Sequence, residues 1–335
     1  MRTFPCSCGN KLFFDCTRCL KCGLETGMCP ECNRVVPFIA DKKGGLRCGH
    51  ADCGMALQKC FNYAVEQICN RCLRIDAAGQ ETRCDYCCLT KVIPDLAIDG
   101  NREKWGLLER AKHRVLFTVD LVGLPFRPNQ DSHVSVLSFE FKADGVRPTS
   151  TGHKDGCITI NIREADDIER EKARVEFQEP QRTLVGHFRH ELGHYFWDRL
   201  VKGQREEQCR SSFGDERDPP YAEALTSYHA NGPQPNWQQQ FISAYATMHP
   251  WEDFAETFGA YLDMVSVLDT AGHFGITSGG LEDVDAMIKS YQQVGLIANE
   301  LNRDMGLVDL VPEVFVPPVI EKLRFIHLLR SDAAR

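Results

Sequence analysis

The sequence predicts an α+β protein in two parts, a small cysteine-rich region at residues 1–94 and a larger domain at residues 95–335. Cysteine is distributed unevenly, since 15 of the 17 cysteines lie between Cys6 and Cys88. After the stretch TKVIPDL the composition becomes that of an ordinary globular domain, in which segments of strand alternation and of helical periodicity follow one another. A chain of 335 residues has room for two or three domains with a sizeable core.

Composition and charge restrict the partners that we expect. The N-terminus has no apolar segment of the kind that directs export, and no run of about 18 apolar residues occurs, so we expect a soluble, cytoplasmic protein without a membrane partner. Residues 1–94 carry 13 Lys and Arg against 9 Asp and Glu, and the remainder carries 26 against 38. The basic residues are scattered and few aromatic residues alternate with them, so nucleic acid is only weakly supported as a partner.

Closely spaced cysteines predict zinc binding in the first region. The pairs Cys6-x-Cys8 and Cys19-x2-Cys22 have the spacing of a zinc ribbon, in which two tight turns present four thiolates to one ion. In a reducing compartment such pairs favour metal over disulfides. Two or three structural zinc ions are expected, and they supply folding energy to a segment poor in large apolar residues. The candidate ligands are Cys6, Cys8, Cys19, Cys22, Cys29, Cys32, Cys48, Cys53, Cys60, Cys69, Cys72, Cys84 and Cys87.

The spacing of the later cysteines leaves their grouping open. One assignment places the pair Cys29 and Cys32 with the pair Cys69 and Cys72, and places Cys48 or Cys53 with Cys60, Cys84 and Cys87. Grouping by neighbours in the sequence is nearly as well supported. Cys16 and Cys88 are left over in both schemes, and His50 is a substitute ligand.

Three elements are predicted early in the larger domain. The run from Arg102 to Val119 has apolar residues at intervals of three and four, which is typical of a helix. LSFEFK, from Leu137, alternates as a strand with one buried face. ITINIR, from Ile158, alternates in the same way, which places its isoleucines inward and Thr159, Asn161 and Arg163 outward. The acidic and basic segment EADDIEREKARVEF then has a helical pattern.

The stretch GHFRHELGHYFWDRL, residues 186–200, carries three histidines on one helical face. His187, His190 and His194 fall at i, i+3 and i+7, but only the frame that starts at His190 gives H-E-x-x-H. In that frame two imidazoles converge on one ion, and Glu191 lies beside the open coordination position, where a carboxylate can take a proton from water. The segment is apolar on most sides, which predicts a buried helix whose histidines need partners.

A catalytic zinc site of this type needs a third protein ligand. We favour Glu252, because it opens the helical pattern HPWEDFAETFGAYLD, whereas Asp198 lies too far along the axis of the metal helix. Glu256 then lies one turn after Glu252, where it can accept a hydrogen bond from a ligating histidine, as in the gluzincin arrangement. The other downstream carboxylates are Asp215, Glu216 and Glu223.

Hydrolysis of an amide also needs a donor for the tetrahedral oxyanion. The chain offers several chemically able side chains near the metal-binding segments. His249 and Tyr245 are candidates, and Tyr221 and Tyr228 remain alternatives.

Several long stretches resemble the zinc-binding metallopeptidase family whose members carry an N-terminal zinc ribbon. They are TGHKDGCITINIREADDIEREKARVEFQEPQRTLVGHFRHELGHYFWDRLV, FGDERDPPYAEAL and SAYATMHPWEDFAETFGAYL, together with CSCGNKLFFDCTRCLKCG for the ribbon. The resemblance implies a zincin-like domain with His190 and His194 as ligands and Glu191 as base. Zincins place a strand just upstream of the metal helix along the cleft, and the strand from Ile158 is the candidate. More cysteines than the family pattern contains lie between residues 29 and 88.

We therefore expect a zinc hydrolase that acts on the peptide bonds of a protein or peptide substrate, with one catalytic zinc ion. Three alternatives remain open. The first is a zinc-ribbon module that binds protein or nucleic acid and carries a degenerate hydrolase domain. The second is a protease that acts on DNA-bound proteins, and the third is an amide hydrolase that does not cleave peptides.

Overall fold

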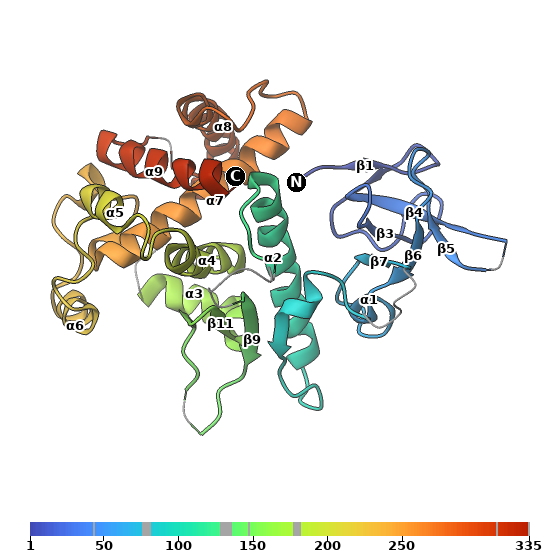
Figure 1. Cartoon of the computed structure of the whole chain (residues 1–335), viewed down its shortest axis with the longest axis horizontal. Helices are drawn as coiled ribbons and strands as arrows, with labels where there is room; N and C mark the ends of the chain where they lie inside the picture. The colour runs from blue at the N-terminus through green and yellow to red at the C-terminus, as the bar shows by residue number, and fades with distance from the viewer. Residues whose placement is uncertain are drawn as a thin grey trace.

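The computed structural model describes residues 1–42, 44–75, 82–127, 136–146, 148–176, 182–312 and 314–333. Short strands gather at one end of the molecule and a mostly helical body forms the other, with the long helix α2 (Asn101–Val122) between them (Figure 1). This arrangement confirms the predicted α+β class with its cysteine-rich N-terminal part. In the described part of the chain, no helix is long and apolar enough to cross a membrane.

The N-terminal region is built from short antiparallel strands. β1 (Phe4–Pro5) pairs with β2 (Lys11–Leu12). A five-stranded sheet follows in the order β3-β4-β5-β6-β7, and the helix α1 (Phe61–Ala64) lies between its last two strands in the sequence. The strands of this sheet are β3 (Thr26–Cys29), β4 (Arg34–Ala40), β5 (Leu46–Cys48), β6 (Ala56–Lys59) and β7 (Cys72–Arg74). Cysteines form much of its buried interior, which suits a region that depends on metal for folding.

The sheet of the larger domain has the order β10-β11-β9-β8. It comprises β8 (Thr90–Val92), β9 (Ser138–Lys142), β10 (Gly152–Lys154) and β11 (Cys157–Asn161). β8 and β11 both pair in parallel with β9, and β10 pairs antiparallel with β11. The strand from Ile158 was expected to pair with an extended substrate, but it has no free edge, because β11 has neighbours on both sides and β10 takes the edge.

Two residues of this sheet depart from simple alternation or from the expected boundary. Asn161 was predicted to point outward, but it is buried, and its amide donates to Asp144 Oδ1 at 2.6 Å and to the carbonyl of Thr149 at 2.9 Å. These bonds satisfy the polar side chain, so its burial is tolerated. Thr90 begins β8 before the expected boundary at residue 94, so the chain enters the sheet of the larger domain within the cysteine-rich segment.

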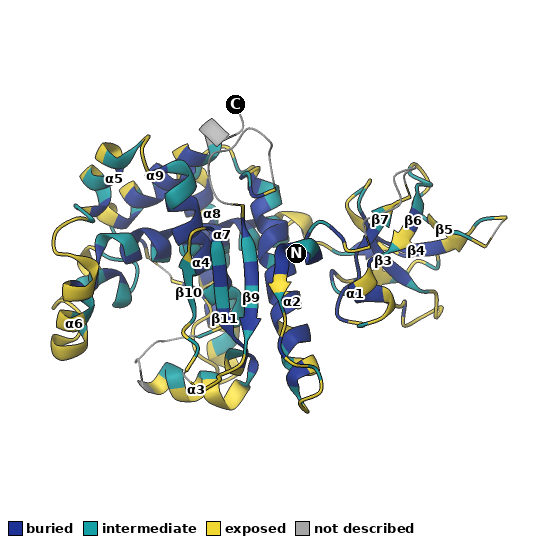
Figure 2. Cartoon of the chain, turned by 60° about the horizontal axis from the view of Figure 1, so that its bottom comes forward, coloured by how far each residue is buried: buried dark blue, intermediate teal, exposed yellow. Residues whose placement is uncertain are grey.

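Helices make up most of the larger domain. They are α2, η2 (Ile162–Ala165), α3 (Asp167–Glu176), α4 (Leu184–Leu200), α5 (Glu206–Phe213), α6 (Tyr221–Asn231), η3 (Trp237–Gln239), η4 (Tyr245–Thr247), α7 (Pro250–His273), α8 (Val284–Asp304) and α9 (Pro317–Ala333). α7 packs against α4, α8 and α9, and Figure 2 shows the buried residues concentrated along α2, α4 and α7. α3 and α6 are mostly exposed. The central position of α4 and α7 makes them a rigid base for a site.

Candidate metal centres

The close packing of α4 on α7 depends on Gly193. A Cβ atom at this position would lie 2.7 Å from the Cα of Ala255, so only glycine lets the two backbones approach this closely. Thr183 caps α4 by accepting a hydrogen bond from the Gly186 amide at 2.9 Å. α7 begins with Pro250 at its first turn, and His249 Nδ1 accepts from the Trp251 amide at 3.1 Å. The two helices thereby bring their polar residues face to face.

Three side chains converge where these helices meet. His190 Nε2 lies 3.1 Å from His194 Nε2 and 3.0 Å from Glu252 Oε2, and the distance from His194 Nε2 to Glu252 Oε2 is 3.4 Å. A tetrahedral zinc ion with Zn–N distances of about 2.0–2.1 Å holds its ligand atoms about 3.3 Å apart. Among the described residues, the buried Glu252 Oε2 meets no donor in hydrogen-bond geometry. The donor set and its spacing therefore fit one zinc ion.

The residues around this group fix the orientation of its imidazole and carboxylate groups. His190 Nδ1 lies 2.6 Å from Glu256 Oε1, and Ser243 Oγ donates to Glu256 Oε2 at 2.7 Å. A proton on Nδ1 leaves the lone pair of His190 Nε2 free for a metal. Tyr221 donates its hydroxyl hydrogen to Glu252 Oε1 at 2.8 Å. Although burial opposes ionisation, His190 and His194 hold the pKa of Glu252 well below its usual range.

Glu191 is buried beside the group without joining it. Glu191 is 8 % exposed, and its Oε2 has no hydrogen-bond partner among the described residues. Burial raises the pKa of Glu191 above that of an ordinary glutamate, while the nearby His190 and His194 oppose the shift. A buried carboxylate with a free oxygen is suited to accepting a proton from a group that enters the site.

The third histidine of the segment has a different partner. His187 Nδ1 contacts Glu164 Oε2, and Thr151 donates to the other oxygen of Glu164. His187 therefore ties α4 to η2 and lies outside the metal-binding group. Asp198 is also outside it, 4.0 Å from His153 Nδ1.

The candidate oxyanion donors differ in their distance from the ligand residues and in their burial. The ring centroid of Tyr245 lies 6.1 Å from that of His190. His249 is 4 % exposed and uses Nδ1 to cap α7. The ring of Tyr228 lies 5.7 Å from that of Tyr245.

Two residues of the site were not predicted. Ser243 orients Glu256, and the indole of Trp251 stacks on the His194 ring with centroids 3.7 Å apart. Ser243 has no motif of its own, because its role depends on a loop that folds back onto α7. Trp251 directly precedes Glu252, and this adjacency is the only signal that could have indicated it.

Cysteine side chains form three further groups. Cys6 and Cys22 sulfurs lie 3.7 Å apart, as do those of Cys8 and Cys19. The second group has separations of 3.8 Å for the pairs Cys29–Cys53 and Cys32–Cys48, and the third has 3.9 Å for Cys69–Cys84. A tetrahedral zinc ion with Zn–S distances of about 2.3 Å separates its sulfurs by about 3.8 Å, whereas a disulfide needs about 2.05 Å. All these cysteines are free thiols whose spacing fits zinc.

The cysteines group with their neighbours in the sequence, and not according to the assignment that paired Cys29 and Cys32 with Cys69 and Cys72. Cys29 and Cys32 share a group with Cys48 and Cys53, and the third group contains Cys60, Cys69, Cys84 and Cys87. Cys72 was expected to be a ligand but lies in none of the groups found in the described part of the chain. It already belongs to β7, where it pairs with Lys59, so no tight turn brings its sulfur to that of Cys69. Cys16, Cys88 and His50 also lie outside the groups.

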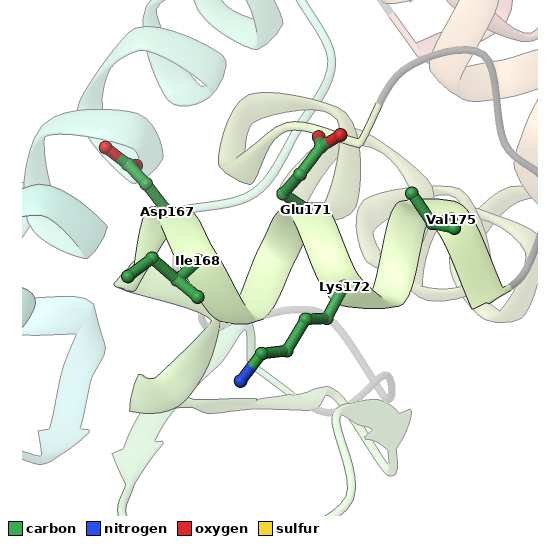
Figure 3. Close-up of a pocket in the computed structure, with 5 residues that line it drawn as sticks. All are labelled: Asp167, Ile168, Glu171, Lys172 and Val175. Carbon is green, nitrogen blue, oxygen red and sulfur yellow. The ribbon is translucent and has the colours of Figure 1, made fainter.

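The hollow at the outer face of α3 is unrelated to these centres. It is lined by Asp167, Ile168, Glu171, Lys172 and Val175, all from one exposed helix (Figure 3). None of the converging histidines or carboxylates lines it, so it adds nothing to the candidate site.

Comparison with known proteins agrees with this arrangement. A family model described as "putative zinc-binding metallo-peptidase" matches residues 101–329, and a zinc-ribbon domain model matches residues 3–98. Uncharacterized proteins of Mycobacterium bovis and of two strains of Mycobacterium tuberculosis are each 35 % identical to the chain over 346 residues. These alignments cover 100 % of this chain and 96 % of each relative. No solved structure matches the chain.

Proposed function

Because the chain belongs to the family of zinc-binding metallo-peptidases, we propose that it hydrolyses peptide bonds at a zinc centre held by His190, His194 and Glu252. One observation carries the proposal. Three ligand atoms, separated by 3.0–3.4 Å, converge beside a buried Glu191 oxygen that has no partner among the described residues. A purely structural site would have no use for an unpartnered carboxylate at this position.

Each residue of the site has a distinct role in the proposed reaction. A zinc ion held by these residues supplies Lewis-acid chemistry, which makes water a stronger acid and a carbonyl a better electrophile. Glu191 takes a proton from the attacking water and then delivers it to the leaving amine. Its buried position beside the ligand residues suits both steps, since the carboxyl must accept and release the same proton. Glu256 orients His190, and Tyr221 orients Glu252.

Tyr245 is the best placed tyrosine to donate to the oxyanion, because its ring lies beside that of His190, whereas Tyr221 already donates its single hydroxyl hydrogen to Glu252. His249 is a second candidate, because its Nδ1 accepts from the Trp251 amide and its buried Nε2 has no hydrogen-bond partner among the described residues. Removing one oxyanion donor typically costs about 10²–10³ in kcat.

An extended peptide is the substrate that we propose for the edge of this sheet. β10 is the edge strand next to β11, and it packs against the metal helix α4. A free strand edge can hydrogen-bond to an extended main chain, which gives affinity without strong dependence on sequence. We therefore place the substrate main chain along β10, in place of the strand first expected.

Four zinc ions per chain complete the proposal. Three would occupy the four-thiolate groups and one the His190 centre. A reducing compartment keeps such thiolates available, and the cytoplasm is the compartment that we propose.

The decisive experiment combines a metal count with a search for cleavage. Zinc per chain is measured in the full-length protein and in Glu252→Ala, and both are incubated with a mixed peptide library followed by mass spectrometry. We expect the variant to lose one zinc ion and the wild type to produce new peptide termini that a chelator abolishes. A zinc-loaded wild type that yields the same peptides as Glu191→Gln would refute the peptidase assignment.

A further inference from the structure

The third cysteine group is joined to the larger domain. Cys60, Cys69, Cys84 and Cys87 are all buried, with exposed fractions between 0 and 6 %. Cys87 begins the short helix η1 (Cys87–Leu89), which leads directly into β8. β8 then pairs with β9 in the sheet of the larger domain. A ligand of the third group is therefore continuous with that sheet.

A histidine of α2 contacts this group. His113 is 4 % exposed, and its Nε2 lies 3.5 Å from Cys87 Sγ and 3.4 Å from Glu109 Oε2. A proton on this nitrogen can be donated to the thiolate and is attracted by the nearby carboxylate. The ring of Tyr86 packs edge-on against His113 with centroids 5.4 Å apart, which fixes the imidazole from the other side.

The carboxylate partner of His113 belongs to a buried ionic network. Glu109 and Lys112 are both 0 % exposed, and Lys112 Nζ lies 2.7 Å from Glu109 Oε2. Thr90 of β8 accepts from Lys112 Nζ at 2.6 Å and donates to Glu109 Oε1 at 2.7 Å. Trp105 Nε1 donates to the same carboxylate oxygen at 3.2 Å. The network holds β8 to α2 on one side and reaches Cys87 on the other.

Cys87, Glu109 and His113 lie close enough together to suggest a second cation site, but the network argues against one. The ammonium group of Lys112 already neutralises Glu109. An added cation would be repelled by this buried positive charge at short range. The cluster therefore serves the four-thiolate centre instead of binding an ion of its own.

The network also reaches the metal helix through a single layer of aromatic rings. Lys112 Nζ lies 5.4 Å from the ring centroid of Phe139 and 5.8 Å from that of Phe141. These rings pack on Phe188 of α4, with centroids 5.8 and 6.0 Å apart. Phe188 precedes His190 by two residues. The path from Cys87 to α4 is thus continuous and buried.

We propose that the third cysteine group binds a zinc ion that supports the metal helix α4, with His113 as the outer hydrogen-bond donor to Cys87. His113 acts through Cys87 and is a positioning residue. The inference rests on the proposed function only where it treats α4 as the helix that carries the catalytic site. Outer partners of metal ligands commonly change metal affinity by about 10–100-fold.

The role of His113 is tested in the full-length protein loaded with ¹¹³Cd, in which each four-thiolate site gives its own NMR resonance. His113→Phe removes the donor, and His113→Gln keeps an N–H group. Phe117→Leu is the matched control, because Phe117 is buried on the same helix but packs on Phe14 of the first ribbon. We expect His113→Phe to shift one resonance and to speed the release of one zinc equivalent to a chelator by about 10–100-fold.

The same data can overturn this assignment. His113→Gln should release its zinc at nearly the wild-type rate, and Phe117→Leu should leave zinc release from the third centre unchanged. An unchanged resonance and release rate in His113→Phe would contradict the hydrogen bond. Equal acceleration in Phe117→Leu would show a general loss of stability instead.

Support of α4 is tested by hydrogen exchange, which requires no substrate and so is independent of peptidase activity. Cys69→Ser removes the third centre, and Cys22→Ser removes the first. We expect faster exchange in β8, β9 and α4, or unfolding of the larger domain, in Cys69→Ser alone. Unchanged exchange of α4 in Cys69→Ser, or equal effects of the two variants, would overturn the proposal.

Discussion

The thiolate groups and the histidine–carboxylate group differ in the number of ligand atoms they supply and in the structure that surrounds them. Each thiolate group supplies four ligand atoms, which complete a tetrahedron and leave no position for a reactant. The group of His190, His194 and Glu252 supplies three, and beside it lies an oxygen of Glu191 that has no partner within the described part of the chain. The closed centres lie among small apolar clusters between short strands, whereas the open centre lies between two long, buried helices. Two features therefore distinguish the thiolate groups from the histidine–carboxylate group: the number of ligand atoms, and whether the nearest polar atom already has a hydrogen-bond partner.

The difference extends to the scaffold. The N-terminal strands are between two and seven residues long, and they enclose cysteines together with apolar side chains such as Val35, Phe38 and Leu57. α4 and α7 instead pack with fully buried rings such as Phe196, Phe254 and Phe258. Loss of zinc from the first two thiolate groups should therefore unfold the N-terminal strands and leave the helix pair in place.

The largest expected effect is the loss of a thiolate ligand. Cys29→Ser should reduce zinc by one ion per chain and unfold β3–β6, because structural zinc sites supply about 10–16 kcal/mol of apparent binding energy. Cys16→Ser is the control, since Cys16 lies outside all three groups. Zinc content and limited proteolysis would show the difference. Loss of zinc in both variants, or in neither, would contradict the grouping.

Glu191→Gln should separate catalysis from metal binding at the open centre. We expect peptide cleavage to fall by about 10²–10⁴-fold, because general base catalysis contributes this much. Zinc content should stay at the wild-type value, since Glu191 is not among the converging ligands. Cleavage rates on the peptides found for the wild type, measured beside zinc content, provide the check. Full activity in this variant would remove Glu191 from the reaction.

The helical body should depend on buried ion pairs where the N-terminal region depends on metal. Lys322 of α9 lies 2.6 Å from Asp253 of α7, and both side chains are buried. Lys322→Met would leave Asp253 buried and unpaired, and we expect about 3–5 kcal/mol of lost stability in urea unfolding. Arg324→Met on the same helix breaks only exposed pairs with Asp285 and Glu321, and should cost about 0–1 kcal/mol. Similar losses in the two variants would contradict the importance of the buried pair.

The smallest expected effect concerns the orientation of one ligand. Glu256→Ala should weaken zinc binding at the open centre by about 10–100-fold, because His190 loses the acceptor of its Nδ1 proton. The thiolate centres should be unaffected. Competition with a chelator of known affinity measures the change, and Glu223→Ala on the exposed face of α6 is the control. Equal affinity in the wild type and Glu256→Ala would mean that His190 needs no partner.

The helices that hold the site could be predicted from the sequence more accurately than the grouping of residues that are distant along the chain. Helical spacing within residues 186–200 and 249–263 predicted that His190, His194, Glu252 and Glu256 would each face one direction, and the structure places them together. The mixed fold class was confirmed as well. These predictions succeed because a period of 3.6 residues fixes relative positions over one or two turns.

Features that depend on contacts between distant segments could not be predicted in this way. Cys72 has the same local spacing as a ligand pair, yet strand pairing removes it from its expected partner. The order of the sheet decides that β10 and not β11 forms the edge, and alternation alone does not encode that order. His113 was missed because an isolated histidine in a helix has no spacing signal to link it to Cys87.

The position of β8 limits how the chain can be divided. A fragment that began at residue 95 would lack Thr90–Val92 and uncover the edge of β9. Exposed strand edges recruit other chains, so such a fragment would be prone to aggregation in spite of its intact H-E-x-x-H helix. Thr90 would also be lost from the buried Glu109–Lys112 pair. The composition changes near residue 95, but the sheet of the larger domain already begins at Thr90, within the cysteine-rich segment.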